Sequence, residues 1–340
     1  MKAAIFYGPN LPLKVEEVPM PVIGTGEVLI KVAACGLCHT DLSYIDHGVP
    51  TFKKPPLILG HEISGTVAEV APDVTKFKVG DRVLVPAVIA CGICDNCREG
   101  RGNICSNMIM PGNDMDGGYA EYMKVRADNL FNLPDEIPLI EGAIIADAIT
   151  TPYHAVKDRA KVRPGDKVVV YGCGGVGLNL VQIANAAGAT VIAVDISDTK
   201  LAKAKELGAV ATFNANDVPD VAKAIRKFTG GGADIACECI GNPKTLEVAF
   251  NTVRNGGRFV IVGYTQHTMT LNASRMMYRE MEVVGSFGCP LQDYPKVIEM
   301  VRIGKIQVVS MVSKRFTLDQ INEGLDYLRS GEGFRSVIVP

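Results

Sequence analysis

Four cysteines stand close together in the first half of the chain, in the pattern C-x2-C-x2-C-x7-C. They are Cys91, Cys94, Cys97 and Cys105. Thiolates at this spacing close one tetrahedral shell around a zinc ion, and a shell of four sulfurs leaves no open position for a reaction. The spacing therefore predicts a structural zinc site. A pair of disulfides, or four unrelated buried thiols, is the alternative, but nothing else about the chain is typical of a secreted protein.

A glycine-rich turn in the second half of the chain supplies the pattern G-x-G-x-x-G. It follows the apolar segment 167–171 and precedes the helical segment 178–187, which is the context of a dinucleotide-binding turn. In that context the three glycines permit a tight bend, a close approach to a pyrophosphate and close helix–strand packing; in this order they are Gly172, Gly174 and Gly177. Gly175 and Val176 open the helix, whose positive end favours phosphate groups.

Asp195 stands at the end of the next expected strand, 190–194. A carboxylate at this place accepts hydrogen bonds from an adenosine ribose and repels a 2′-phosphate. The sequence therefore predicts NAD, and not NADP, as the coenzyme. A structural glycine turn with Asp195 as a helix cap is the alternative.

Three residues of the first part of the chain offer the ligands of a catalytic metal. Cys38, His61 and Asp147 supply sulfur, imidazole and carboxylate. Three protein ligands leave a fourth position for water or a substrate oxygen. A lone cysteine or histidine is more often a core residue than a ligand. Here a four-cysteine run and a dinucleotide turn occur in the same chain, and this combination favours a catalytic zinc.

The elements that must position these residues indicate two domains, which is also the number that 340 residues suggest. Residues 1–135 alternate short apolar runs with Gly, Pro and Asp, which is typical of a mainly β domain. From about Asp158 the rhythm changes to strand, glycine turn and helix. Strands are expected at 167–171, 190–194, 235–239, 258–262 and 282–284, with helices at 178–187, 199–207, 218–228 and 242–253.

This alternation predicts a doubly wound parallel sheet of the α/β class. After Gly285 the pattern changes again, to helical segments at 294–303 and 318–330 and an apolar strand at 336–339. We expect that last strand to return to the β domain. The coenzyme domain would then be inserted into the other one.

Composition and charge exclude some classes of function. The hydrophobic fraction is 47%, and no apolar run approaches the roughly 20 residues of a membrane-spanning helix. A net charge of -2 gives no global argument for nucleic-acid binding. The start of the chain, Met1–Ile5, runs directly into an apolar strand pattern without a secretory leader. We therefore expect a cytoplasmic protein that binds neither membrane nor nucleic acid.

The order of these features closely resembles the zinc-dependent alcohol dehydrogenases of the medium-chain dehydrogenase/reductase superfamily. Gly60-His61-Glu62 is followed by the four-cysteine run and then by the glycine turn, over nearly the whole chain. The resemblance implies a GroES-like catalytic domain at 1–147 and 286–340, a Rossmann domain at 148–285, and an active-site cleft at their junction. It also implies NAD, two zinc ions per subunit, a small-molecule substrate, and a homodimer or homotetramer.

The resemblance further implies roles for individual residues. The catalytic zinc would be held by Cys38, His61 and Asp147, with Glu62 as a transient ligand or as the resting third ligand instead of Asp147. Two residues next to Cys38 would assist: Asp41 by orienting His61, and Thr40 by taking the alcohol proton. Coenzyme contacts are implied for Thr151 beneath the nicotinamide, Lys200 near the adenosine ribose, and His39 and Arg335 at the phosphates.

Two positions depart from the best-known members of that family. Many members have a cysteine or a histidine-type ligand where this chain has Asp147, although some relatives use Asp. Ser43 stands where many carry the histidine that ends a proton relay, and a hydroxyl is a poor terminal base at neutral pH. His47 or water is the alternative end of the relay, and a surface-loop role is an equally good interpretation of His47.

Several segments outside the zinc and NAD motifs resemble a narrower family, the 6-hydroxycyclohex-1-ene-1-carbonyl-CoA dehydrogenases of anaerobic benzoyl-CoA degradation. They are residues 38–44, 85–89, 110–115, 146–153, 288–290 and 293–295. This resemblance implies oxidation of a secondary ring alcohol, carried on a CoA thioester, to the 6-oxo compound with reduction of NAD. A general zinc alcohol or polyol dehydrogenase is the alternative, and a non-catalytic NAD-binding zinc protein is a remote one.

Overall fold

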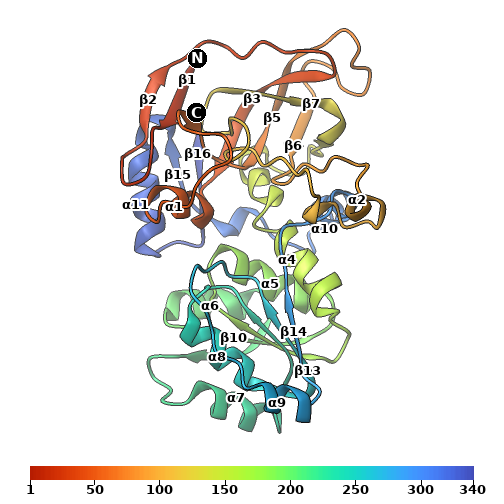
Figure 1. Ribbon diagram of the computed structural model, residues 1–340, viewed down its shortest axis with the longest axis vertical. Coiled ribbons are helices and arrows are strands. Elements are labelled where there is room, and N and C mark those ends of the chain that lie inside the picture. Colours follow the sequence, from red (N-terminus) through yellow and green to blue (C-terminus); the bar gives the residue numbers. More distant parts are fainter. The chain divides into compact units, whose positions relative to one another are not determined.

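The computed structural model describes the whole chain, residues 1–340. The chain divides into two compact units. One consists of Met1–Thr150 together with Gly288–Pro340, and the other of Thr151–Phe287. Both ends of the chain belong to the first unit, so the second is an insertion in it (Figure 1). These limits lie a few residues from the predicted domain boundaries.

A parallel sheet forms the centre of the second unit, in the order β11-β10-β9-β12-β13-β14. Its strands are β9 (Lys167–Tyr171), β10 (Thr190–Asp195), β11 (Ala209–Asn214), β12 (Ala233–Glu238), β13 (Val253–Ile261) and β14 (Glu282–Gly285). The chain starts in the middle of the sheet, builds one half and then returns to build the other, which is a doubly wound topology. The predicted α/β class with a parallel sheet is confirmed.

Helices cover this sheet (Figure 1). They are α5 (Gly175–Ala186), α6 (Asp198–Glu206), α7 (Val221–Thr229), α8 (Pro243–Thr252) and α9 (Ala273–Tyr278), preceded by α4 (Thr150–His154) and a π-helical turn (Ala155–Ala160). Because helices lie on both faces, the central strands are apolar throughout. In β9 the residues Val168, Val169 and Val170 are all fully buried.

The first unit is built on antiparallel pairing of β3 with β5 and β7. Its larger sheet has the order β15-β16-β3-β5-β6-β8, and a small sheet has the order β2-β1-β4. The strands are β1 (Lys2–Phe6), β2 (Lys14–Glu17), β3 (Glu27–Gly36), β4 (Leu57–Ile58), β5 (Glu62–Val70), β6 (Arg82–Val85), β7 (Tyr122–Arg126), β8 (Phe131–Asn132), β15 (Val312–Thr317) and β16 (Arg335–Val339). The last strand, β16, pairs with β3 and so returns to this unit.

Short helices connect these strands. They are α1 (His39–Ile45), α2 (Asp95–Arg98), α3 (Leu139–Gly142), α10 (Tyr294–Arg302) and α11 (Ile321–Ser330), with 3₁₀ turns at Gly102–Ile104, Ala127–Asn129, Ala143–Ala146, Leu291–Asp293, Val309–Met311 and Leu318–Gln320. None of the helices in the chain combines the length and the apolar composition that crossing a membrane requires.

Candidate active site

The structure brings four potential metal ligands of the first unit together. One ligand atom each of Cys38, His61, Glu62 and Asp147 lies within 4.8 Å of all the others. Asp147 Oδ2 is 3.8 Å from Cys38 Sγ and 3.7 Å from His61 Nε2. Two ligands bound at about 2.0–2.3 Å to one zinc ion lie up to roughly 4.5 Å apart. The sulfur, nitrogen and oxygen donors therefore fit a single zinc ion.

Strand pairing places the first three of these residues. Gly36 at the end of β3 is opposite Glu62 at the start of β5, so the chain just after β3 lies beside His61. A side chain at residue 36 would place its Cβ 2.0 Å from Glu62 Oε2. Glycine at this position lets the two strands bring Cys38 to His61. Asp147 does not follow a strand but comes directly after the 3₁₀ turn Ala143–Ala146.

A buried ion pair lies beside the ligand group. Arg335, the first residue of β16, donates to both carboxylate oxygens of Glu62, with Nε 3.0 Å from Oε2. Its Nη2 is also 3.9 Å from Asp147 Oδ2. The side chains of Arg335 and Glu62 are 3% and 0% exposed. The guanidinium therefore neutralises carboxylate charge that would otherwise be costly to bury. The implied phosphate contact of Arg335 stays a prediction.

Asp41 and Tyr119 lie behind His61. Asp41 Oδ1 faces His61 Nδ1 at 3.8 Å, and both atoms are buried without a hydrogen-bond partner. The other oxygen, Oδ2, accepts hydrogen bonds from the Tyr119 hydroxyl at 2.7 Å and from the Cys38 amide at 3.1 Å. Asp41 is thus held from two sides while it faces His61. This leaves the opposite ring nitrogen, Nε2, directed at Asp147.

The charges of the group favour a bound cation. Burial opposes ionisation of the Cys38 thiol, but Arg335 and His61 outweigh it and lower the Cys38 pKa. Burial also disfavours a charged His61, yet Cys38 and Asp147 raise the His61 pKa well above its usual value. A thiolate and a carboxylate therefore gather around one imidazole. A zinc ion would compensate the same negative charge.

The residues proposed for proton transfer lie on α1. Thr40 Oγ1 is 3.6 Å from Cys38 Sγ. Ser43 donates its hydroxyl proton to the His39 carbonyl at 3.2 Å. His39 and His47 are exposed, at the start of α1 and just beyond its end. The structure thus places Thr40 at the metal ligands, with Ser43 one turn further along α1 and His47 beyond the end of this helix.

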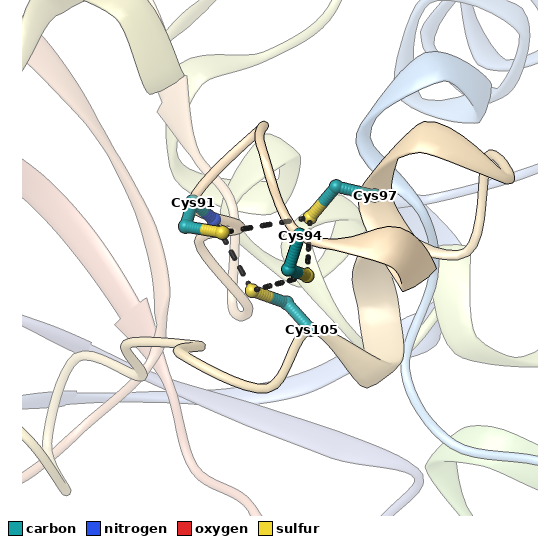
Figure 2. A group of neighbouring side chains, drawn as sticks. All are labelled: Cys91, Cys94, Cys97 and Cys105. Carbon is teal, nitrogen blue, oxygen red and sulfur yellow. Dashed lines mark hydrogen bonds between the residues drawn. The ribbon is translucent and has the colours of Figure 1, made fainter.

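The four cysteines of the C-x2-C-x2-C-x7-C run converge in a separate lobe of the first unit (Figure 2). Cys94 Sγ lies 3.5 Å from Cys97 Sγ and 3.7 Å from Cys105 Sγ, and Cys91 Sγ lies 3.9 Å from Cys97 Sγ. All ten cysteines of the chain are free thiols, so the disulfide alternative does not apply. The geometry fits a tetrahedral zinc with four sulfur ligands.

Backbone groups support these sulfurs. The amides of Cys91 and Asn107 each donate to Cys105 Sγ at 3.3 Å. Hydrogen bonds from the amides of Ile93 and Cys94 lower the pKa of Cys91 to about 6. Burial and the neighbouring Cys94 sulfur raise the pKa of Cys97 to about 12. Without a metal, some of these thiols ionise readily and others stay protonated, whereas a zinc ion favours the thiolate form of all four.

The glycine turn of the second unit joins β9 to α5. Gly172 has a φ of +88°, a conformation that glycine adopts without strain. A Cβ at residue 177 would lie 1.7 Å from the Gly172 carbonyl oxygen, whereas one at Gly174 would meet nothing within 4 Å. Gly174 therefore borders open space at the start of α5, where no side chain caps the helix. This arrangement fits a pyrophosphate group at the helix N-terminus.

Asp195 lies next to this turn, at the end of β10. Its Oδ2 accepts a hydrogen bond from the Cys173 amide at 2.6 Å, and its Oδ1 accepts from the amides of Ile196 and Ser197. Lys200 lies in the first turn of α6, where its amide donates to the Ser197 hydroxyl. The carboxylate is thereby held at the carboxyl edge of the sheet. Thr151 belongs to the same unit, in α4.

Comparison with known proteins agrees with this geometry. Residues 24–135 match the alcohol dehydrogenase GroES-like domain, and residues 175–302 match the zinc-binding dehydrogenase family. An alcohol dehydrogenase of Geobacillus stearothermophilus is 37% identical over 333 residues, which cover 98% of this chain and 97% of that protein. The chain belongs to the zinc-dependent alcohol dehydrogenases.

Other members of the family are similar along their whole length. The sorbitol dehydrogenase of Bacillus subtilis is 36% identical over 332 residues, covering 96% of this chain and 93% of that protein. The crystal structure of the alcohol dehydrogenase from Aeropyrum pernix has a TM-score of 0.92 and 33% identity, with all of both chains covered. The GroES-like and Rossmann folds are therefore confirmed for this dehydrogenase.

Family membership also supports the chemistry expected from the sequence. The protein is an oxidoreductase of a zinc- and NAD-dependent family that acts on CH–OH groups. This finding favours an enzyme over the non-catalytic alternative. The two groups of potential ligands are consistent with two zinc ions in each chain of this dehydrogenase.

Sequence reasoning missed three features around the metal site of this dehydrogenase. They are the Tyr119 hydroxyl on Asp41, the Arg335 guanidinium on Glu62, and the Tyr294 hydroxyl on the Ala146 carbonyl, which directly precedes Asp147. No spacing rule connects residues so far apart in the chain. Tyr294 lies within a segment that carries the narrower resemblance, but its contact emerges only from the structure.

Proposed function

We propose that this zinc-dependent alcohol dehydrogenase oxidises a secondary cyclic alcohol to a ketone, with Cys38, His61 and Asp147 holding the catalytic zinc. The observation that carries the proposal is the convergence of these three side chains and Glu62 within 4.8 Å. Three ligands leave one position for the substrate oxygen. The four-cysteine lobe has no such position, so we place the reaction at the mixed ligand group.

Asp147 is proposed as the resting third ligand in preference to Glu62. Both carboxylate oxygens of Glu62 accept hydrogen bonds from Arg335. Asp147 Oδ2 lies 3.7 Å from the ring nitrogen of His61 and 3.8 Å from the sulfur of Cys38. Binding of Glu62 to the metal would require its ion pair with Arg335 to open, so we assign it only a transient contact.

Each remaining residue has a proposed part in the hydride transfer. When bound, zinc lowers the pKa of the substrate alcohol and NAD accepts the hydride at C4 of its nicotinamide. Thr40 would take the hydroxyl proton and release its own proton to His47 or water, while Asp41 keeps Nε2 of His61 directed at the ligand group. The C–H bond of the carbinol carbon breaks with its electron pair, and a carbonyl group forms.

We propose coenzyme contacts for residues of the second unit and for two residues of the first. Gly172, Gly174 and Gly177 hold the pyrophosphate against the start of α5, and Asp195 and Lys200 contact the adenosine ribose. Thr151 supports the nicotinamide. His39 and Arg335 contact the phosphates.

The proposed substrate is 6-hydroxycyclohex-1-ene-1-carbonyl-CoA, and the product is its 6-oxo counterpart. Support comes from residues 38–44, 85–89, 110–115, 146–153, 288–290 and 293–295, which resemble the corresponding CoA-ester dehydrogenases outside the zinc and NAD motifs. Several of these segments border the ligand group. Cys38 opens the first segment, and Asp147 lies in the fourth.

A general alcohol or polyol dehydrogenase is the second candidate. Relatives that match over nearly their full length are named alcohol dehydrogenase and sorbitol dehydrogenase. Such an enzyme would use the same zinc and NAD residues. The two candidates differ only in the groups that bind the rest of the substrate, so substrate preference distinguishes them.

The deciding experiment measures NADH formation with 6-hydroxycyclohex-1-ene-1-carbonyl-CoA, free cyclohex-2-enol, sorbitol and a series of simple alcohols. Turnover of the thioester alone would support the CoA-ester substrate and show that the CoA moiety contributes to binding. Comparable turnover of the free alcohols or sorbitol would contradict it and leave the general dehydrogenase. An Asp147→Asn variant serves as the control for zinc-dependent turnover.

We also propose that the protein works in the cytoplasm as a homodimer or homotetramer. The four-thiol lobe supports the first point, because its cysteines must remain reduced to bind zinc. The family resemblance supports the second. Light scattering of the purified protein would distinguish a dimer from a tetramer, and a monomer would contradict the proposal.

A further inference from the structure

Tyr294 connects two backbone segments of the first unit through its hydroxyl group. The hydroxyl donates a hydrogen bond to the Ala146 carbonyl at 2.7 Å and accepts one from the Ala87 amide at 3.3 Å. The side chain is only 1% exposed. Its ring stacks on Phe131, with centroids 5.0 Å apart and planes inclined by 9°. Packing therefore fixes the position of the hydroxyl, which then links both segments.

One of the linked segments carries Asp147. Ala146 is the last residue of its 3₁₀ turn, and Asp147 leaves that turn with φ -140° and ψ -57°. The direction of the Asp147 side chain therefore depends on how the peptide before it is held. The Ala146 carbonyl accepts a second hydrogen bond, from the Thr150 hydroxyl at 2.9 Å. Two hydroxyl groups thus meet at the carbonyl that directly precedes Asp147.

The other two proposed zinc ligands have a different kind of support. Cys38 and His61 adjoin β3 and β5, which are paired in the sheet. Asp147 lies outside the strands, and its side chain is 18% exposed, against 2% for His61. Ala87, at the other end of the Tyr294 link, follows β6, a neighbour of β5. Tyr294 therefore connects the ligand outside the sheet to the sheet that supports the others.

We propose that Tyr294 is a positioning residue that sets the Asp147 carboxylate for the catalytic zinc. The inference rests on the proposed function, in which Asp147 is a zinc ligand. Groups that orient metal ligands typically change metal affinity by about 10-fold to 100-fold when they are removed. Tyr294 acts one residue away from the ligand, so we expect an effect of about 10-fold. A role in packing alone would leave zinc affinity unchanged.

The test compares variants of the full-length protein that remove either the hydroxyl or the ring stacking. Tyr294→Phe keeps the aromatic ring and removes both hydrogen bonds. Phe131→Leu keeps the hydroxyl and removes the stacked partner. Zinc per chain is measured by atomic emission after equilibration with graded concentrations of a chelator, and the melting temperature is measured alongside. The cysteine lobe provides an internal reference, because Tyr294 forms its hydrogen bonds with Ala146 and Ala87 and with none of the four cysteines.

The expected result is selective loss of one zinc. In Tyr294→Phe the zinc held with Asp147 should bind about 10-fold less tightly, while the zinc of the cysteine lobe stays. The kcat should fall by more than the KM rises, because the substrate oxygen meets a misplaced ligand set. Phe131→Leu should lower the melting temperature and weaken zinc binding by less than Tyr294→Phe does, because the hydroxyl and its two acceptor and donor groups are still present.

Thr150→Val is the second variant, because it removes the other hydrogen bond to the Ala146 carbonyl. Since both hydroxyl groups share one acceptor, the double variant should lose more zinc affinity than the product of the two single losses predicts. Tyr171→Phe, which removes a buried hydroxyl from the other unit, is the matched control and should keep both zinc ions.

Two outcomes overturn the inference in distinguishable ways. If Asp147→Asn releases one zinc but Tyr294→Phe and Thr150→Val bind zinc as the wild type does, Tyr294 only packs and the inference fails alone. If Asp147→Asn keeps both zinc ions, Asp147 is not a required zinc ligand, and both the proposed ligand set and the inference that rests on it are contradicted. Selective zinc loss in both Asp147→Asn and Tyr294→Phe supports the inference.

Discussion

The two candidate metal centres of this dehydrogenase differ in how far apart their ligands lie in the chain and in how deeply they are buried. The cysteine lobe takes all its ligands from residues 91–105, and three of its four cysteines are partly exposed. The mixed group takes its ligands from the N-cap of α1, the start of β5 and the turn before α4, and three of its four members are buried. A local loop thus closes one centre, whereas the tertiary fold must assemble the other.

The centres also differ in what stabilises their anionic ligands. Backbone amides donate to the sulfurs of the lobe, as those of Cys91 and Asn107 do to Cys105. In the mixed group a buried guanidinium, Arg335, lies against Glu62 and near Asp147. Backbone dipoles stabilise the sulfurs of the lobe near solvent, whereas the buried carboxylate of Glu62 is compensated by a full positive charge. A closed structural site and an open reactive one therefore place different demands on the fold.

The largest expected effect comes from removing a ligand of the mixed group. Cys38→Ser should lower kcat on the order of a thousandfold, or about 4 kcal/mol, because polarisation of the alcohol is lost. Zinc content should fall from two ions per chain to one. Steady-state kinetics and atomic emission measure the two effects. Cys237→Ala, at a buried cysteine of the other unit, is the control; unaltered turnover of Cys38→Ser would contradict the assignment.

The next largest effect is expected on stability, when the buried ion pair between Arg335 and Glu62 is broken. Arg335→Met leaves Glu62 buried without its counter-charge, so we expect the free energy of unfolding to fall by about 3–5 kcal/mol. Glu299→Gln breaks an exposed pair with Arg302 and should lower the free energy of unfolding much less, because solvent screens exposed charges. Denaturant titration compares the two variants. Equal losses of unfolding free energy in the two variants would mean that the buried pair contributes no more to stability than the exposed one.

Removing a ligand of the lobe should affect stability more than chemistry. Cys97→Ser should release the zinc of the lobe, expose residues 91–105 to hydrogen exchange and lower the melting temperature by several degrees. The kcat per folded chain should fall by less than about 10-fold, because no lobe residue meets the substrate. Hydrogen exchange and kinetics on the same sample check this. A loss of turnover as large as that of Cys38→Ser would remove the distinction between the centres.

The smallest expected effect is the pH dependence of zinc release from the lobe. Backbone hydrogen bonds lower the pKa of Cys91 to about 6, so its thiolate form dominates above that pH. The stabilisation from this thiolate is complete above the pKa of an unfolded thiol and is lost as the pH falls through about 6. Zinc should therefore leave the lobe more readily below about pH 6, measured with a zinc-binding dye. Release that does not depend on pH would argue against thiolate ligation.

Sequence patterns anticipated five of the six strands of the second unit and missed one edge strand. The expected strand 167–171 coincides with β9, whose valines are fully buried. No pattern indicated β11, an edge strand in which only the first residue, Ala209, is buried. Similarly, α1 is a short helix whose start depends on Asp41 accepting a hydrogen bond from the Cys38 amide. Apolar periodicity reports burial, and these elements have little of it or are very short.

The chemistry of the two ligand groups was foreseeable to different degrees. Spacing was sufficient for the cysteine lobe, since a few turn residues separate its ligands. For Asp147 the sequence offered only a carboxylate in a segment that resembles relatives. Its distance of 3.7 Å from His61 and its neighbour Arg335 come from the packing of segments far apart in the chain.

The amino-acid sequence by itself determined the four-thiol metal motif, the glycine turn with its acidic partner Asp195, and the alternation that builds a parallel sheet. These features are local, because neighbouring residues and the periods of helix and strand define them. Only the tertiary structure decided which charges surround the open metal group, with Arg335 on Glu62 and Tyr294 on the peptide before Asp147. Such contacts join distant segments, and their geometry depends on how whole strands and turns pack.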